Sequence, residues 1–103
     1  MLVENVQVLM SDGVFRKGSV EFDDVIKKVE VCEAFDAGVG PYLIPGLIDL
    51  HTHGACGGDH SHGSKEKMQE MAVFYAKNGV TSFLATTLTS PVDVLENAMR
   101  NLA

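Results

Sequence analysis

His51 and His53, which are separated by one residue, form the part of this chain whose residue types and spacing favour chemistry. The pair ends an apolar segment that follows Pro45 and Gly46. In a strand, side chains two positions apart share a face, with Cα atoms about 6.5 Å apart. Imidazole nitrogens bind Zn²⁺ at about 2.0–2.1 Å, so both side chains can reach one ion. We therefore predict that His51 and His53 are metal ligands.

The spacing alone is a weak signal, because a chain with four histidines can contain such a pair by chance. Its position at the end of an apolar strand, directly before glycine-rich sequence, strengthens the prediction. The alternative is a pair of surface histidines at a strand end. Asp49 lies on the same face of the predicted strand, one layer deeper, whereas Ile48, Leu50 and Thr52 lie on the other face. One face is therefore apolar, and the other carries ligand-type residues.

A second pair with the same spacing, His60 and His62, lies in the glycine-rich loop at residues 54–63. Because a loop holds ligands less firmly than a strand end does, we expect both imidazoles to face solvent. A role as metal ligands, or in the rim of a pocket, is the alternative. Cys56 in the same loop is expected to be a small loop residue rather than a reactive thiol or a ligand.

The composition argues against several classes of function. The 103 residues suffice for about one small domain, and 46% of them are hydrophobic. A net charge of −6 argues against nucleic acid or an anionic membrane as a partner. No segment approaches the roughly 20 apolar residues of a membrane span, and the N-terminus does not resemble a secretory signal. Cys32 and Cys56 lie far apart in the sequence, which favours free thiols in a cytoplasmic protein.

The elements that must position these residues fall into two parts. Three short strands joined by turns are predicted in the first part, at residues 3–9, 14–22 and 25–31. The first part ends at a boundary marked by Gly38, Gly40 and Pro41. We therefore predict a small β unit at residues 1–42 and a different unit at residues 43–103.

The second part alternates strands and helices. The predicted order is a strand at 43–53, a helix capped by Ser64 and stopped by Gly79, a strand at 80–87, and a helix with Ser90 as its cap and Pro91 at its first position. The apolar stripes of the two helices consist of Met68, Met71, Ala72 and Tyr75, and of Val94, Leu95, Ala98, Met99 and Leu102. Two strand-helix units in succession imply parallel strands with functional residues at their C-terminal ends.

From about residue 43 to residue 91 the chain resembles the amidohydrolase superfamily, and within it the N-acetylglucosamine-6-phosphate deacetylases. The segments that carry the resemblance are PGLIDLHTHGACGGD at 45–59 and NGVTSFLATTLTSP at 78–91. The glycine-rich loop ending in Asp59 is more typical of the deacetylases, although those relatives tend to carry apolar residues at 60–62. The resemblance implies a hydrolase of amino-sugar catabolism that removes the acetyl group from N-acetylglucosamine 6-phosphate.

The resemblance also implies a fold and a site. The fold would be α/β, with a β-sandwich portion at 1–42 and the first two units of an incomplete TIM-like (β/α)8 barrel at 43–103. His51 and His53 would bind a divalent metal, zinc or iron, with one or two ions in the complete enzyme. Asp49 would orient an imidazole or act structurally. The residues expected to shape the pocket loop are Gly57, Gly58 and Asp59.

Such a barrel takes roughly 200–250 residues, and a catalytic zinc site needs about three protein ligands. We therefore assign no catalytic residue here and expect an N-terminal fragment that is inactive alone. Its open strand edges predict self-association into a homo-oligomer. The expected partner is a small-molecule amino-sugar phosphate, with no nucleic acid and no membrane. The alternatives are another amidohydrolase, such as an amidase or deaminase, and a non-catalytic module that binds metal or a protein partner.

Overall fold

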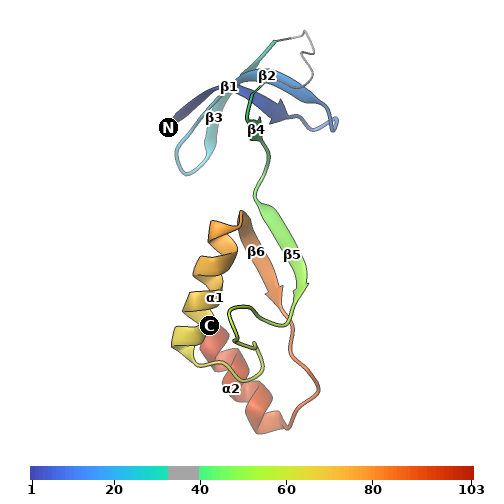
Figure 1. Ribbon diagram of the computed structural model, residues 1–103, viewed down its shortest axis with the longest axis vertical. Helices are drawn as coiled ribbons and strands as arrows, with labels where there is room; N and C mark the ends of the chain where they lie inside the picture. The colour runs from blue at the N-terminus through green and yellow to red at the C-terminus, as the bar shows by residue number, and fades with distance from the viewer. Residues whose placement is uncertain (33–39) are drawn as a thin grey trace. The chain divides into compact units, whose positions relative to one another are not determined.

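The computed structural model describes residues 1–32 and 40–103, so Gly38, one of the predicted boundary residues, lies outside the described residues. Contacts divide the chain into two compact units, Met1–Pro45 and Gly46–Ala103 (Figure 1). Each unit is described separately below. No helix among the described residues is long and apolar enough to cross a membrane. Cys32 and Cys56 are both free and exposed, which agrees with the predicted free thiols.

The first unit is a four-stranded sheet in the order β3-β2-β1-β4. Its strands are β1 (Leu2–Leu9), β2 (Phe15–Phe22), β3 (Ile26–Val31) and β4 (Tyr42–Leu43). β2 pairs antiparallel with β1 and β3, and β4 pairs parallel with β1. The three hairpin strands match the predicted segments. The described part of this unit is a single sheet, without the second layer of a sandwich.

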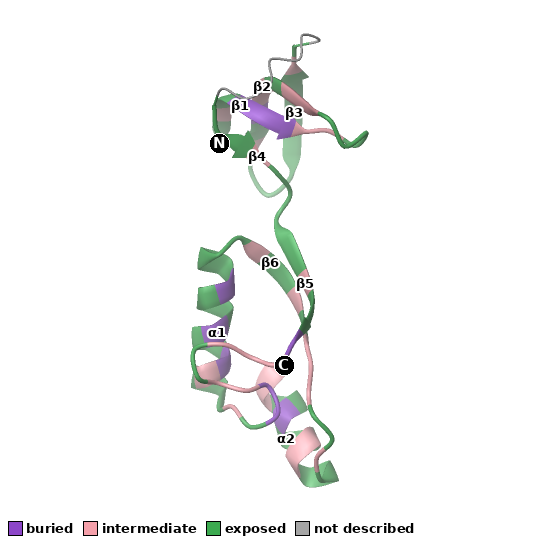
Figure 2. Ribbon diagram, turned by 45° about the vertical axis from the view of Figure 1, so that its right-hand side comes forward, coloured by how far each residue is buried: buried purple, intermediate pink, exposed green. Residues whose placement is uncertain are grey.

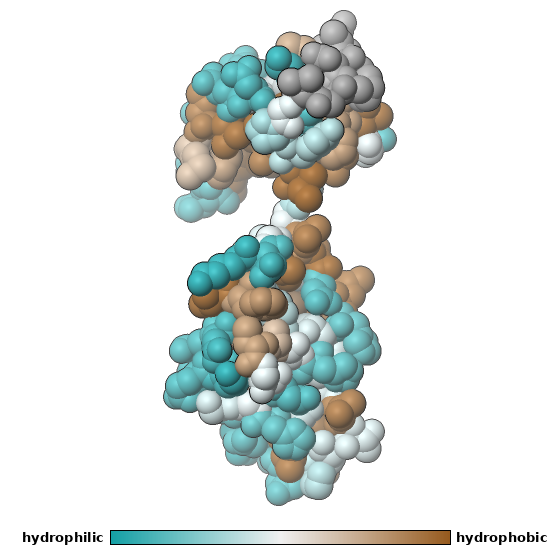
Figure 3. All heavy atoms as spheres, viewed as in Figure 1, coloured by the Kyte–Doolittle hydropathy of each residue, from teal (hydrophilic) through white to brown (hydrophobic). Residues whose placement is uncertain are grey.

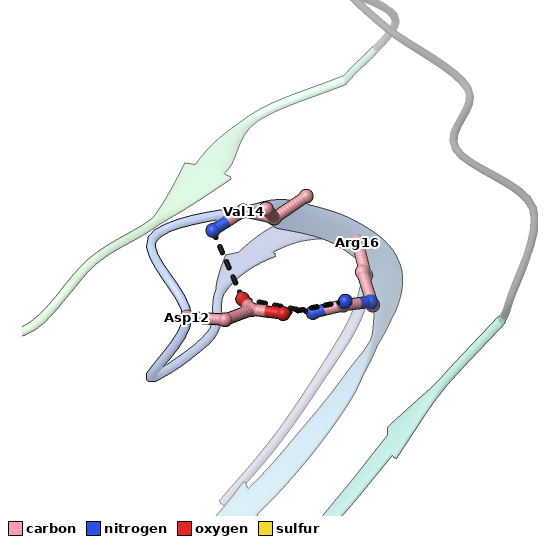
Figure 4. A network of polar contacts seen from close by, with 3 residues as sticks. All are labelled: Asp12, Val14 and Arg16. Carbon is pink, nitrogen blue, oxygen red and sulfur yellow. Dashed lines mark hydrogen bonds and ion pairs between the residues drawn. The ribbon is translucent and has the colours of Figure 1, made fainter.

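The turn between β1 and β2 is held by Asp12. Its Oδ1 accepts the backbone N–H of Val14 at 3.0 Å, and the Arg16 guanidinium donates to both carboxylate oxygens at 3.0 and 2.6 Å (Figure 4). The hydrogen bond from Arg16, followed by that from Val14, lowers the pKa of Asp12 to about 2. Because the pair is exposed to solvent, it fixes the turn geometry more than it stabilises the fold.

The core of the first unit consists of Val6, Val8 and Val20. Beside it lies an apolar groove of about 400 Å³, whose lining includes Phe22 and Ile26. Ile26 is 68% exposed, so part of the apolar surface of this sheet faces solvent. Figure 3 shows apolar side chains at the surface of both units.

The second unit contains β5 (Leu47–Thr52), α1 (Lys65–Lys77), β6 (Val80–Ala85) and α2 (Val92–Leu102). β5 and β6 pair in parallel, as the alternation of strands and helices predicts. Ser64 caps α1, since its Oγ accepts the backbone N–H of Lys67 at 3.3 Å. The helix ends at Asn78, and Gly79 follows with a φ of +80° that glycine adopts without strain.

Met68, Met71 and Tyr75 on α1 form the core of this unit, together with partly buried residues that include Phe83 of β6 (Figure 2). The predicted apolar stripes are therefore confirmed in part. Ala72 and Met99, which belong to the same stripes, are exposed instead. On both helices, the apolar residues therefore extend over a wider arc than the part of the helix that packs in the described core.

Three predicted element boundaries are wrong, and the simplest is the strand expected at 80–87, which ends at Ala85. The strand expected at 43–53 is divided, because Leu43 pairs with β1 through β4 and β5 begins only at Leu47. Pro45, which lacks a backbone N–H, lies in the break. At α2 the N-cap is Pro91 rather than Ser90, since Pro91 has an extended ψ of 148° and the helix begins one residue later.

Candidate metal centre

His51 and His53 come together at the C-terminal end of β5. Their Nε2 atoms are 3.2 Å apart, and their ring planes meet at 71°. Two nitrogens bound to one tetrahedral zinc ion at about 2.05 Å would be separated by about 3.3 Å. The separation of the two nitrogens thus fits a shared ion, and it equally fits a hydrogen bond between the two rings. His51 is exposed and His53 is half-buried, so the pair is open on one side.

Among the described residues, His51 and His53 are the candidate ligands that lie together. They contain no group of three or more His, Cys, Asp or Glu side chains arranged to hold an ion. Within this part of the chain, the buried Nδ1 of His53 has no hydrogen-bond partner. Metal-binding histidines almost always donate their other ring N–H to a carboxylate, a carbonyl or water. A complete site would thus need further ligands and an acceptor for His53.

Asp49 lies next to the pair and is half-buried in β5. Its Oδ1 accepts the backbone N–H of His51 at 3.1 Å. The carboxylate thereby fixes the backbone of His51. Its expected action on an imidazole stays a prediction.

The loop after His53 folds back on itself and packs on α1. Gly54 has a φ of +144°, and a Cβ there would clash with the carbonyl oxygen of Gly58. A Cβ on Gly58 would lie 2.7 Å from Cγ of Lys67 and 3.1 Å from Sδ of Met71. Gly57 has a φ of +72° and open space around it. Gly54 and Gly58 are therefore needed for close approach of neighbouring atoms, whereas Gly57 is needed for its backbone angle.

The prediction that both loop histidines face solvent is wrong for His60. His60 is 0% exposed, whereas the side chain of His62 is 65% exposed. The His60 ring stacks on Phe83 with centroids 5.5 Å apart, and its backbone N–H donates to the carbonyl of His53 at 2.8 Å. Residues 59–62 form a turn, in which side chains two positions apart do not share a face. The only sequence signal for burial came from the resemblance described above, which implies apolar residues at 60–62.

Burial lowers the pKa of His60, because the charged imidazolium loses its solvent. Neither ring nitrogen of His60 has a hydrogen-bond partner among the described residues. The His60 ring is therefore a buried imidazole stacked on Phe83 whose burial favours the neutral form, and the backbone of the same residue is hydrogen-bonded to the carbonyl of His53.

Asp59 organises the turn that holds His60. Its Oδ1 accepts the backbone N–H of Ser61 at 2.6 Å and lies 3.7 Å from Nδ1 of His62. The hydrogen bond from Ser61 is the largest cause that lowers the pKa of Asp59. Ser61 is buried, and its Oγ accepts the backbone N–H of Leu88 at 3.1 Å. The loop is thus joined to the segment that follows β6.

One polar contact near the histidines was not predicted. Thr52, between His51 and His53, is hydrogen-bonded through its hydroxyl to the hydroxyl of Tyr75 at 2.8 Å. From the sequence, Tyr75 was assigned only to the helix core. The helical stripe showed which side of α1 is buried, but it carried no information about the partner of a single hydroxyl.

Comparisons with known proteins find deacetylases that are similar to nearly the whole chain, although no family model matches the chain. An N-acetylglucosamine-6-phosphate deacetylase from Lysinibacillus sphaericus is 41% identical over 107 residues, covering 97% of this chain and 27% of the relative. The solved structure of an N-acetylglucosamine-6-phosphate deacetylase from Thermotoga maritima superposes with a TM-score of 0.79 and 35% identity. The chain is homologous to the N-terminal region of these deacetylases.

The match to the Thermotoga deacetylase covers 97% of this chain and 26% of that structure. The chain thus spans about a quarter of the length of the deacetylases that align with nearly all of it. A shorter match, 34% identical over 61 residues, is to an N-acetylgalactosamine-6-phosphate deacetylase from Escherichia coli O157:H7. That alignment covers 59% of this chain and 16% of the relative.

Proposed function

We propose that this chain is the N-terminal part of a metal-dependent deacetylase that removes the acetyl group from N-acetylglucosamine 6-phosphate. The observation that carries the proposal is the 3.2 Å separation of the Nε2 atoms of His51 and His53 at the C-terminal end of a parallel strand. The names of the homologous proteins supply the substrate. The fold that we propose for the whole protein is a β-sandwich joined to a (β/α)8 barrel.

In this proposal His51 and His53 hold a divalent ion, zinc or iron, through their Nε2 atoms. Such an ion, when bound, polarises the acetyl carbonyl and lowers the pKa of water towards neutrality. Asp49 keeps the backbone of His51 in place, and the loop of Gly57, Gly58 and Asp59 borders the pocket. Because a catalytic zinc site needs about three protein ligands, a further ligand and the proton-accepting carboxylate would come from later barrel strands.

We also propose that the chain associates with further copies of itself. β5 and β6 form a two-stranded sheet with open edges. Leu50 is 70% exposed and Leu84 is 60% exposed, so apolar surface accompanies those edges. Sedimentation at increasing concentration should show a rising average mass, and a constant monomer would contradict the proposal.

A chimaera tests the function. Residues 1–103 would replace the matching region of the Lysinibacillus sphaericus deacetylase, and acetate release would be measured with both N-acetylglucosamine 6-phosphate and N-acetylgalactosamine 6-phosphate. We expect release from the first substrate, loss of release after His51→Asn or His53→Asn, and retention after His62→Asn, the exposed control. A folded chimaera that releases acetate from neither substrate would contradict the proposal. The 103-residue chain by itself is expected to release none.

A further inference from the structure

The side of β5 opposite the histidines contains a buried pair of hydroxyl groups. Thr52 and Tyr75 are 8% and 6% exposed, and their hydroxyl oxygens are 2.8 Å apart. A buried hydroxyl without a hydrogen-bond partner is unfavourable, so each of these two groups satisfies the other. This hydrogen bond therefore fixes the position of Thr52 relative to α1.

Thr52 is held by two further hydrogen bonds. Its hydroxyl oxygen accepts the backbone N–H of Gly54 at 3.4 Å, and its carbonyl oxygen accepts the backbone N–H of Thr86 at 2.8 Å. The residue between the two histidines is thus connected to α1, to the loop after His53, and to the end of β6. Of these three connections, the one to Tyr75 is the only one made by a side chain at both ends.

Tyr75 is itself well fixed. Its ring lies 4.8 Å from that of Phe83 and 6.4 Å from that of His60, measured between centroids. Tyr75 belongs to α1, which is capped by Ser64 and closed at Asn78. The hydroxyl of Tyr75 is therefore a rigid point on the helix to which the strand end is attached.

We propose that Tyr75 is a positioning residue for the metal pair: its hydroxyl holds Thr52 so that the Nε2 atoms of His51 and His53 stay at the separation of two ligands on one ion. This inference rests on the proposed metal-binding function of the pair. His51 directly precedes Thr52 and His53 directly follows it. A rotation of the backbone at Thr52 would therefore move both imidazoles. Ligand pairs lose affinity when their geometry is held less closely.

The test measures Zn²⁺ binding to the full chain by calorimetric titration, with circular dichroism to confirm that each variant is folded. Tyr75→Phe removes only the hydroxyl, and Tyr42→Phe is the matched control, since Tyr42 is 57% exposed and belongs to the other unit. We expect Tyr75→Phe to weaken Zn²⁺ binding about tenfold and Tyr42→Phe to leave it unchanged.

Variants of Thr52 keep the test decisive if Tyr75→Phe fails to fold. Thr52→Val removes the hydroxyl at nearly constant shape and should weaken Zn²⁺ binding as Tyr75→Phe does, whereas Thr52→Ser should bind like the unaltered chain. The double variant should lose no more than either single one, because both remove the same hydrogen bond. A merely structural role would lower the melting temperature without this pattern in the affinities.

The outcomes separate the two proposals. If the unaltered chain and His51→Asn bind Zn²⁺ equally, the histidine pair is not a metal site, and both proposals are overturned. If His51→Asn abolishes binding but folded Tyr75→Phe and Thr52→Val bind Zn²⁺ as tightly as the unaltered chain, only the positioning role is overturned.

Discussion

His51 and His53 flank the end of strand β5, whereas His60 and His62 lie in a turn of the following loop. The two pairs have the same spacing in the sequence. The first pair brings two ring nitrogens within 3.2 Å of each other. In the second pair, one imidazole is fully buried against Phe83 and the other is exposed beside Asp59.

The difference lies in the backbone that carries each pair. An extended strand turns successive side chains to opposite faces, so residues two apart converge on one side. A tight turn changes the chain direction over the same distance, so the two side chains diverge. A His-x-His pattern therefore has meaning for metal binding only together with the element on which it lies.

Replacement of single histidines should give the largest difference in Zn²⁺ binding between the two pairs. His51→Asn and His53→Asn are each expected to abolish measurable Zn²⁺ binding, because each removes one of two converging nitrogens. His62→Asn should bind Zn²⁺ normally, since its side chain is exposed and pairs with Asp59. Calorimetric titration measures all three. A loss of binding in His62→Asn would show that the two pairs act together.

The glycines of the loop between the two histidine pairs should give the next largest effect. Gly54→Ala is expected to lower the free energy of unfolding by about 3 kcal/mol, because of its positive φ and the clash with Gly58. Gly57→Ala, with open space around the added atom, should lower it by only about 1 kcal/mol. Urea unfolding measures both. Equal losses would mean that the loop does not need the close approach.

His60→Leu should stabilise the chain by about 1–3 kcal/mol in urea unfolding, because it removes two buried ring nitrogens that lack partners among the described residues. The backbone hydrogen bond from residue 60 to His53 remains in this variant. His62→Leu is the control and should change stability by less than about 0.5 kcal/mol. A destabilised His60→Leu would indicate that ordered water satisfies the imidazole.

Asp59 should give the smallest effect. The pKa of Asp59 in the folded chain lies below the ordinary aspartate value of 3.8. Its stabilising effect is therefore complete above that pH and disappears as the pH falls through the folded-state pKa. Asp59→Asn should therefore lower stability at pH 7 by less than about 1 kcal/mol, since the side chain is 41% exposed. The difference in unfolding free energy should vanish in acid. A difference that is independent of pH would exclude the ionised carboxylate as its source.

Local signals in the sequence predicted much of the second unit. The hydroxyl of Ser64 and the backbone freedom of Gly79 define the two ends of α1, and both act within a few residues. The parallel pairing of β5 and β6 followed from the order of strands and helices. These features depend on neighbouring residues or on simple topology, which a sequence displays directly.

Features that depend on distant residues could not be predicted in this way. Leu43 leaves the expected strand because it pairs with Val8, and His60 is buried because Phe83 offers a ring on which it stacks. The hydrogen bond from Tyr75 to Thr52 likewise joins positions that only the packing of α1 against the sheet brings together. The metal role of His51 and His53 stays a prediction that binding measurements must decide.

Oxidation of the Met71 sulfur can report on opening of the structure around the glycine-rich loop. Met71 is 0% exposed, and its Sδ lies 3.2 Å from the backbone nitrogen of Ala55 in that loop. A peroxide can reach this sulfur only after local or global opening of the structure around it, whereas Met99, which is 51% exposed, is accessible at all times. The ratio of the two oxidation rates therefore reports how often the core beneath the glycine-rich loop becomes accessible.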